Sequence, residues 1–338
     1  MRAFVITGPR AASVVAVARP VAGRGRVVVD VERAGVCGTD MEFYSGEMAY
    51  LRSGDAAYPI RIGHEWCGTV SSVGADVDPA WRGQRVTGDT MLGCGGCPRC
   101  LGGRQHLCAD RYEVGIRGGW PGALAEQLLM PVRSLRRLPA SVDAVAGALV
   151  EPGANALRAV SAAGLSPGDR LLVVGPGTIG LLVALIARAA GVAVDLLGVD
   201  AGSLEFARSL GFDRVWTVDG LPASGGFDAV VDASTGAGVP ALALDLVEPG
   251  KRVVYIGLSE RPSMVDTRVM VLRDLTVTGV LSGSGGLAGT IERYAAGAVD
   301  PRPLVAATVG LSGVADALAG TRPPAWGAAP KVLVDPRA

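Results

Sequence analysis

Four closely spaced cysteines constrain this 338-residue chain more than any other feature of its sequence. They follow the pattern Cys94-x2-Cys97-x2-Cys100-x7-Cys108 in a segment rich in glycine. Thiolates separated by two residues can bind one zinc ion at about 2.3 Å from each sulfur, and four of them close a tetrahedron that leaves no position for water or substrate. The spacing therefore predicts a structural zinc site.

Disulfide bonds in a secreted protein are the alternative for such a group of cysteines. The apolar run at residues 11–18 ends at Arg19-Pro20 without a small-residue cleavage site, which is unlike a signal peptide. The other two cysteines have no evident partners. We therefore expect zinc binding, reduced thiols and a cytoplasmic location. His106 lies inside the cysteine segment, and we expect it at the surface because four thiolates already satisfy the ion.

Composition and charge limit the partners that this chain can have. With 49% apolar and 19% charged residues, the chain has enough material for two hydrophobic cores. Its 32 basic residues balance 32 acidic ones, so no excess of positive charge exists to bind nucleic acid or an anionic membrane. The uncharged residues 171–187 are interrupted by Gly175-Pro176-Gly177, which argues against a membrane span. We expect a small-molecule partner.

A second group of metal-binding residue types lies in Cys37-Gly38-Thr39-Asp40 and Gly63-His64-Glu65. Each motif alone is weak, because a lone histidine is usually a core residue. The chain has only two histidines, however, and His64 stands directly beside a glutamate. A thiolate, an imidazole and a carboxylate together make a catalytic zinc site whose fourth position is open to water or an alcohol oxygen. We expect the nearby Cys67 to be a small buried hydrophobic residue.

A dinucleotide-binding unit is indicated in the middle of the chain. The apolar residues 171–174 suit a parallel strand buried on both faces, and the glycine motif follows at once. Residues 178–190 are then apolar at helical spacing. A strand, a glycine turn and a helix in this order bind a pyrophosphate at the helix N-terminus. The cofactor-binding residues predicted in this motif are Gly175, Gly177, Thr178, Ile179 and Gly180.

Asp200 indicates which dinucleotide this unit binds. It stands twenty residues beyond Gly180, after a predicted strand at 192–199, where a carboxylate can accept hydrogen bonds from ribose hydroxyls. A 2′-phosphate there would meet like charge, and Ala201-Gly202 supplies no arginine to neutralise it. The pattern therefore favours NAD over NADP. Asp200 can also cap the next helix, and one carboxylate can both cap that helix and bind the ribose.

Strands and helices alternate through the rest of this region, which predicts a doubly wound parallel sheet. Ser282 follows the last predicted strand at its carboxyl end, where ligands of such sheets bind. That last strand is apolar and could lie at a sheet edge and pair with a second subunit. The further strands are predicted at 229–232, 252–257 and 275–281, the helices at 203–210 and 240–246, and a closing strand at 331–334.

In this order the motifs resemble those of the zinc-dependent medium-chain dehydrogenases, the alcohol dehydrogenase family. The resemblance runs through nearly the whole chain and implies an α/β protein with a GroES-like, mainly β catalytic domain at 1–147. A Rossmann domain that binds NAD is implied at 148–285, and residues 286–338 would return to complete the catalytic domain. The active site would lie in the cleft between the two domains, and the protein would form homodimers or homotetramers.

The same resemblance assigns roles to individual residues. Cys37 and His64 would bind the catalytic zinc, with either Glu65 or Glu151 as the third ligand, so that each chain would hold two zinc ions. Thr39 would pass the alcohol proton outward, unless it is an ordinary turn threonine. By resemblance Ser282 lies near the nicotinamide.

Glu42 indicates the substrate class, because many relatives have a histidine at that position. The motif that ends in Glu42 resembles the glucose dehydrogenase branch, and Glu113-Val114-Gly115-Ile116 resembles the segment by which those enzymes bind a sugar hydroxyl. Carboxylates suit substrates with several hydroxyl groups. We therefore expect oxidation of a sugar, alditol, cyclitol or amino-cyclitol, although both glutamates could instead be surface acids. The alternatives are an amino-alcohol dehydrogenase of the threonine type and a catalytically silent nucleotide-binding or redox-sensing relative.

Overall fold

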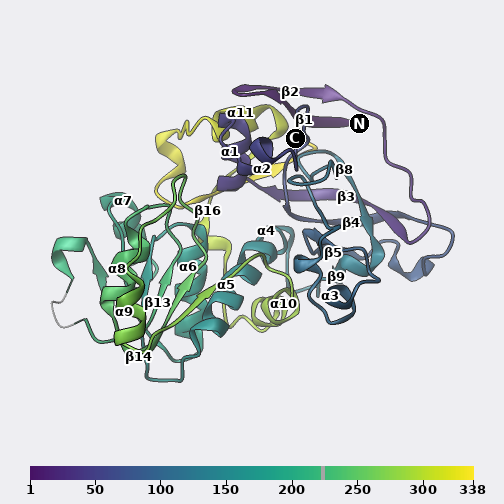
Figure 1. Ribbon diagram of the computed structural model, residues 1–338. Helices are drawn as coiled ribbons and strands as arrows, with labels where there is room; N and C mark the ends of the chain where they lie inside the picture. The colour runs from purple at the N-terminus through teal and green to yellow at the C-terminus, as the bar shows by residue number, and fades with distance from the viewer. Residues whose placement is uncertain (222–224) are drawn as a thin grey trace. The chain divides into compact units, whose positions relative to one another are not determined.

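The computed structural model describes residues 1–221 and 225–338, which form two compact units (Figure 1). Unit 1 comprises Met1–Glu151, Leu287–Gly327 and Lys331–Ala338. Unit 2 comprises Pro152–Gly286 and Ala328–Pro330. Within the described residues, no helix combines the length and the apolar character needed to cross a membrane.

Unit 1 is built on a seven-stranded sheet with the order β16-β17-β3-β4-β5-β9, in which β8 also pairs with β3. The long strand β3 pairs antiparallel with both β4 and β17, so the C-terminal strand joins the sheet of the N-terminal part of the chain (Figure 1). The strands are β3 (Arg26–Gly35), β4 (Glu65–Val73), β5 (Arg85–Gly88), β8 (Gln127–Pro131), β9 (Leu135–Arg137), β16 (Val305–Gly310) and β17 (Lys331–Asp335).

Short elements surround this sheet. At the N-terminus, β1 (Arg2–Gly8) pairs antiparallel with β2 (Ala11–Ala16). A two-stranded sheet of β6 (Met91–Leu92) and β7 (Tyr112–Glu113) flanks the cysteine segment. The helices are α1 (Gly38–Ser45), α2 (Ala49–Ser53), α3 (Pro98–Leu101), α4 (Ala144–Ala148), α10 (Leu287–Ala295) and α11 (Val314–Leu318), and the 3-10 turns are η1 (Pro79–Trp81), η2 (Gln105–Leu107), η3 (Val132–Ser134), η5 (Arg302–Leu304), η6 (Leu311–Gly313) and η7 (Pro324–Trp326).

The main apolar cluster of unit 1 includes alternate residues of β3. Val27, Val29 and Val31 alternate along β3 and are fully buried, as the two-residue period of a strand requires. They belong to one apolar cluster with Phe4 and Trp66. At about 25 cal/mol per Å² of apolar area, the burial of such side chains supplies the main stabilisation of this sheet.

Unit 2 is a parallel sheet with the order β12-β11-β10-β13-β14-β15, which confirms the predicted doubly wound α/β architecture. The apolar run of β10 is buried along its length, because helices cover both faces of such a sheet. The elements are α5 (Val150–Ala163), β10 (Arg170–Val174), α6 (Thr178–Ala189), β11 (Ala193–Leu197), α7 (Ala201–Ser209), β12 (Val215–Trp216), η4 (Val218–Gly220), β13 (Phe227–Asp232), α8 (Val239–Leu246), β14 (Val247–Tyr255), α9 (Thr267–Leu272) and β15 (Thr276–Gly279).

The turn between β10 and α6 is packed at its two ends and open at its centre. Gly175 has φ 95°, a conformation that side chains disfavour. A Cβ at Gly180 would lie 1.9 Å from the carbonyl oxygen of Gly175, so α6 can approach the strand only with glycine there. A Cβ at Gly177 would meet nothing within 4 Å. Close packing therefore requires a glycine at position 180, whereas the backbone at Gly177 faces open space.

These two glycines give a matched pair of substitutions. We expect Gly180→Ala to lower the stability of unit 2 by about 1–3 kcal/mol, because its methyl group must displace backbone. Gly177→Ala should leave the unfolding midpoint nearly unchanged. Urea denaturation of both variants followed by circular dichroism measures the difference, and equal midpoints would contradict the packing argument.

Candidate active site and metal centres

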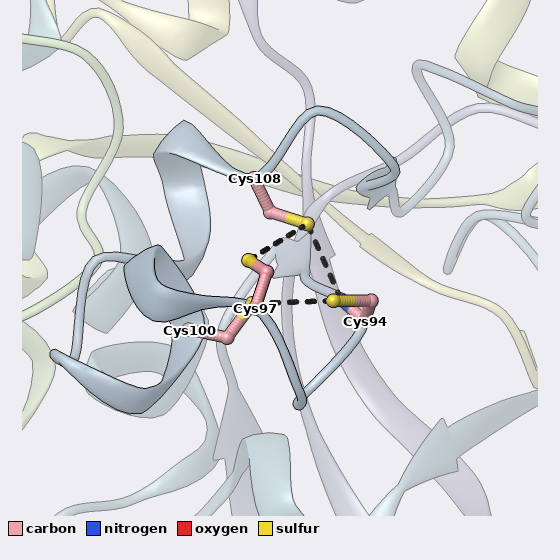
Figure 2. Close-up of side chains that lie close together, drawn as sticks. All are labelled: Cys94, Cys97, Cys100 and Cys108. Atoms are coloured by element: carbon pink, nitrogen blue, oxygen red, sulfur yellow. Dashed lines mark hydrogen bonds between the residues drawn. The ribbon is translucent and has the colours of Figure 1, made fainter.

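The four cysteines of the predicted structural site converge on one point (Figure 2). All four sulfur atoms lie within 4.8 Å of one another. The sulfurs of Cys97 and Cys108 are 3.8 Å apart, and those of Cys94 and Cys100 are 4.0 Å apart. A tetrahedron with zinc–sulfur bonds of about 2.3 Å has edges of about 3.8 Å, so these separations fit a bound zinc ion. Disulfides, with sulfurs about 2 Å apart, are excluded for this geometry.

Local structure prepares this group for a metal. Backbone N–H groups of Gly96 and Cys97 point at the Cys94 sulfur and lower the pKa of that thiol to about 6. Burial raises the pKa of the Cys100 thiol, and a bound cation would favour its ionised form. His106 is buried, which makes the expected surface position wrong. It remains outside the group of converging ligand atoms.

A second converging group consists of Cys37, His64 and Glu65, whose ligand atoms also lie within 4.8 Å of one another. Cys37 precedes α1, His64 precedes β4, and Glu65 begins that strand. His64 and Glu65 are buried. Among the described residues, the His64 Nδ1 atom has no hydrogen-bond partner. A thiolate, an imidazole and a carboxylate at this spacing fit a zinc ion by their chemistry.

Asp40 organises this group, although its role was missed at the level of sequence. Its carboxylate is fully buried and accepts hydrogen bonds from the backbone N–H of Cys37 at 3.0 Å and of Gly63 at 3.2 Å. One of its oxygens lies 3.6 Å from His64 Nδ1. Burial lowers the pKa of His64, but Asp40 and Cys37 outweigh it and raise that pKa well above its usual value. The capping pattern of Cys37 and Asp40 at the start of α1 was the available signal.

Lys331 is the second residue that sequence reasoning missed. It starts β17, is 3% exposed, and donates to both oxygens of Glu65 at 2.8 and 2.7 Å and to the Val36 carbonyl at 2.9 Å. Burial lowers its pKa, but Glu65 and Cys37 outweigh this effect and raise it. A Cβ at Gly35 would lie 1.9 Å from a Glu65 oxygen, so a glycine leaves room for this carboxylate. The signal available in the sequence was that one of the only two lysines of the chain stands in an apolar strand.

The four other residues singled out in this part of the sequence, Thr39, Glu42, Glu151 and Cys67, lie outside the group of converging ligand atoms. Thr39 and Glu42 are half-buried on α1, three residues apart and therefore on one face of that helix. Glu151 is buried near the start of α5, and its carboxylate is not among the converging ligand atoms. Cys67 is fully buried as expected, and burial raises the pKa of its thiol.

Glu113 lies in a buried ion pair. One of its oxygens accepts from Arg111 at 2.8 Å and from the Tyr50 hydroxyl at 3.2 Å. The segment nevertheless lies against the Gly63-His64 turn, since a Cβ at Gly115 would approach the Gly63 backbone to 2.8 Å. The predicted sugar-binding carboxylate thus already has an arginine and a tyrosine as partners.

The nucleotide motif adopts the conformation expected of it. Gly177 is the N-cap of α6 and makes no side-chain cap, so the first N–H groups of the helix are free to bind an anion. Asp200 caps α7 by accepting from Ser203 N at 2.7 Å, which occupies one of its two oxygens. Ser282 follows β15 with φ 65° and accepts at its carbonyl from Arg158.

Comparisons with known proteins agree with this arrangement. Residues 23–140 match the family profile described as alcohol dehydrogenase GroES-like domain, and residues 178–299 match the profile of the zinc-binding dehydrogenases. The chain is 33% identical to L-threonine 3-dehydrogenase of Saccharopolyspora erythraea over 83% of both chains. It is 31% identical to 2-dehydro-3-deoxy-L-galactonate 5-dehydrogenase of Pseudoalteromonas atlantica over 87% of both chains.

Solved structures have the same fold. A zinc-binding dehydrogenase from Sinorhizobium meliloti bound to NADP aligns with a TM-score of 0.89 at 29% identity over 99% of both chains. An alcohol dehydrogenase from Escherichia coli in complex with NADH aligns with a TM-score of 0.88 at 26% identity, again over 99% of both chains. The chain therefore belongs to the zinc-type, medium-chain alcohol dehydrogenase family and is an oxidoreductase that acts on alcohol groups.

Proposed function

We propose that this enzyme uses NAD to oxidise a secondary alcohol of a polyhydroxylated substrate at a zinc site formed by Cys37, His64 and Glu65. The observation that carries this proposal is the convergence of these three ligand atoms within 4.8 Å. Zinc, when bound there, supplies a Lewis acid that eases loss of the alcohol proton. The chain's own residues hold the ligands, orient them and remove the proton.

Asp40 is proposed to orient His64. When a carboxylate accepts a hydrogen bond from the Nδ1–H group of a histidine, it fixes the tautomer of the ring and leaves Nε2 as the ligand atom. The 3.6 Å separation between Asp40 and Nδ1 is close to this contact. Because Asp40 also holds the backbone N–H groups of Cys37 and Gly63, it links the segments that carry two ligands.

Glu65 is proposed as the third ligand at rest rather than Glu151. It is the acidic residue of the converging group, and Lys331 holds its carboxylate in place. A carboxylate has enough lone pairs to accept from lysine and still bind a cation. Lys331 therefore compensates the charge of a carboxylate that is almost completely buried.

Lys331→Met tests this buried pair. Loss of one partner leaves an uncompensated charge in the interior, so we expect a loss of about 3–5 kcal/mol of stability. Lys251→Met is the matched control, because the other lysine of the chain makes a 2.7 Å pair with Asp228 in an exposed position and should matter little. Urea denaturation measures both variants. Equal effects, or no recovery in the double variant Glu65→Gln/Lys331→Met, would refute the proposed role of the pair.

Thr39 is proposed to carry the proton away from the substrate. Its hydroxyl group stands two residues after the Cys37 ligand, in the first turn of α1, and it can accept and donate at once. Glu42 lies on the next turn of the same face. We propose that Glu42 accepts hydrogen bonds from further substrate hydroxyl groups, and that Glu113 does so through its remaining oxygen.

The four-cysteine group is proposed to hold a second, structural zinc ion, which makes two per chain. Its geometry closes the coordination shell, so this ion would stabilise the segment between β6 and β7 without taking part in the reaction. All six cysteines are free thiols in the structure. Free thiols of this kind support a reducing compartment, the cytoplasm.

NAD is proposed as the cofactor because, among the described residues, only one of the two Asp200 oxygens accepts a hydrogen bond, and no arginine follows Asp200 in the first turn of α7. The helix cap at Ser203 is compatible with this role. One of the two solved relatives binds NADH and the other NADP, so the comparisons do not choose between the cofactors. The carboxylate of Asp200 favours NAD, because it would repel a 2′-phosphate.

The proposed substrate class rests on Glu42 and on the relative that acts on a deoxy-galactonate. A second candidate is L-threonine, because several similar proteins are threonine 3-dehydrogenases. Both substrates carry a secondary alcohol beside polar groups.

A panel of aldoses, alditols, cyclitols, sugar acids and L-threonine separates these candidates. We expect NADH to form with one class of polyhydroxylated substrate. His64→Ala should reduce the rate of NADH formation at least a thousandfold without changing the unfolding midpoint of the four-cysteine segment. Turnover of L-threonine alone would replace the proposed substrate class. Equal turnover of simple aliphatic alcohols would also contradict it.

A homodimer is proposed from the edge of the sheet in unit 2. β15 is the terminal strand, and it pairs with β14 alone among the described residues. Several exposed apolar side chains lie just before it: Leu258, Met264, Val271 and Leu272. An open strand edge beside an apolar surface favours pairing with a second copy. Sedimentation should show a dimer or tetramer that Leu272→Lys weakens, whereas a monomer would refute the proposal.

A further inference from the structure

A pocket of about 470 Å³ lies in unit 1 at the cysteine segment, and Cys37, His64 and Glu65 do not line it. Its volume is in the range of sites for small organic ligands. Four segments form its walls: the start of β3, residues 92–94 at the end of β6 and after it, the end of β8 with η3, and β7 with the loops on either side of it. Arg26 and Pro131 are paired across β3 and β8, so regular structure holds two of these walls.

Positive charge dominates the lining, which contains Arg24, Arg26 and Arg133 against the single carboxylate of Asp110. Arg24 contacts Asp76 at 3.4 Å. Across the described residues, neither Arg26 nor Arg133 has a carboxylate within ion-pair distance. The Arg133 guanidinium is held by the Gly93 carbonyl at 2.8 Å, which leaves further N–H groups for a ligand.

Two aromatic rings complete the pocket. The Trp120 indole is fixed by a 3.0 Å hydrogen bond to the Leu129 carbonyl. Arg26 lies over this ring at 5.2 Å from its centroid, and Tyr112 packs against it at 5.7 Å with an interplanar angle of 57°. Arg26 covers one face of the fixed indole, so a flat ring would pack against Tyr112 and the side of Trp120 that Arg26 leaves uncovered, while the arginines bind an anion attached to that ring.

We propose that this pocket binds a small phosphate monoester carried on a ring. A phosphate monoester carries about −1.5 to −2 charges at neutral pH, and Arg26 and Arg133, which make no ion pair among the described residues, supply two guanidinium groups to bind it. Arginine forks suit phosphate oxygens in bidentate geometry, and Trp120 with Tyr112 supplies the surface for the ring. The site is separate from the metal and nucleotide residues of the proposed reaction, except that Cys94 contributes to both the pocket and the four-cysteine group.

Calorimetric titration of the zinc-loaded enzyme with phenyl phosphate and with inorganic phosphate tests this site. We expect one phenyl phosphate per chain, bound at least tenfold more tightly than inorganic phosphate because only the former stacks on Trp120. Arg26→Ala and Arg133→Ala should each weaken binding at least tenfold. Arg26 is exposed, so its variant tests the site even if Arg133→Ala disturbs the Gly93 turn.

Arg137→Ala is the matched control, because Arg137 lies over Trp81 at 4.2 Å in the same unit but outside the pocket. It should leave binding unchanged. The proposal is overturned if phenyl phosphate does not bind, if Arg137→Ala weakens it as much as Arg26→Ala does, or if His64→Ala abolishes it, which would place the ligand in the active site.

Discussion

The pairing of β3 with β4 and β17 is the constraint on which the proposed active site depends. Gly35, near the end of β3, lies opposite Glu65 on one side and Leu333 on the other. Cys37 follows β3, His64 precedes β4, and Lys331 starts β17, so the ends of three strands bring these residues together. A slip of one residue in either register would turn Glu65 or Lys331 to the opposite face of the sheet.

The parallel sheet of unit 2 has a similar effect on the nucleotide residues. Because its strands share one direction, the turns after β10, β11 and β13 lie at the same edge. They are packed closely there: a Cβ at Gly175 would meet the Ala233 carbonyl at 2.9 Å, and one at Gly198 would meet Pro176 at 2.8 Å. The open space at Gly177 contrasts with this packing and is where a pyrophosphate would approach the backbone.

Local sequence patterns predicted the four-cysteine group and the nucleotide motif. The features that the sequence did not predict depend on contacts between residues far apart in the chain. The cysteine spacing and the glycine motif are local, so the convergence of Cys94 to Cys108 and the strand–turn–helix unit followed from sequence. Lys331 is 266 residues from Glu65, and no local pattern links them. The contact of Glu113 with Tyr50 of α2 likewise joins residues 63 positions apart, and the burial of His106 is a property of the folded chain that no local pattern indicated.

The central claim is that two groups of residues in unit 1 each hold a zinc ion. Anomalous diffraction at the zinc edge from crystals of protein purified without chelators tests it most directly. We predict two peaks per chain, one among Cys94, Cys97, Cys100 and Cys108 and one beside Cys37 and His64. A single peak at the four cysteines, with none beside His64 in protein that oxidises alcohols, would contradict it.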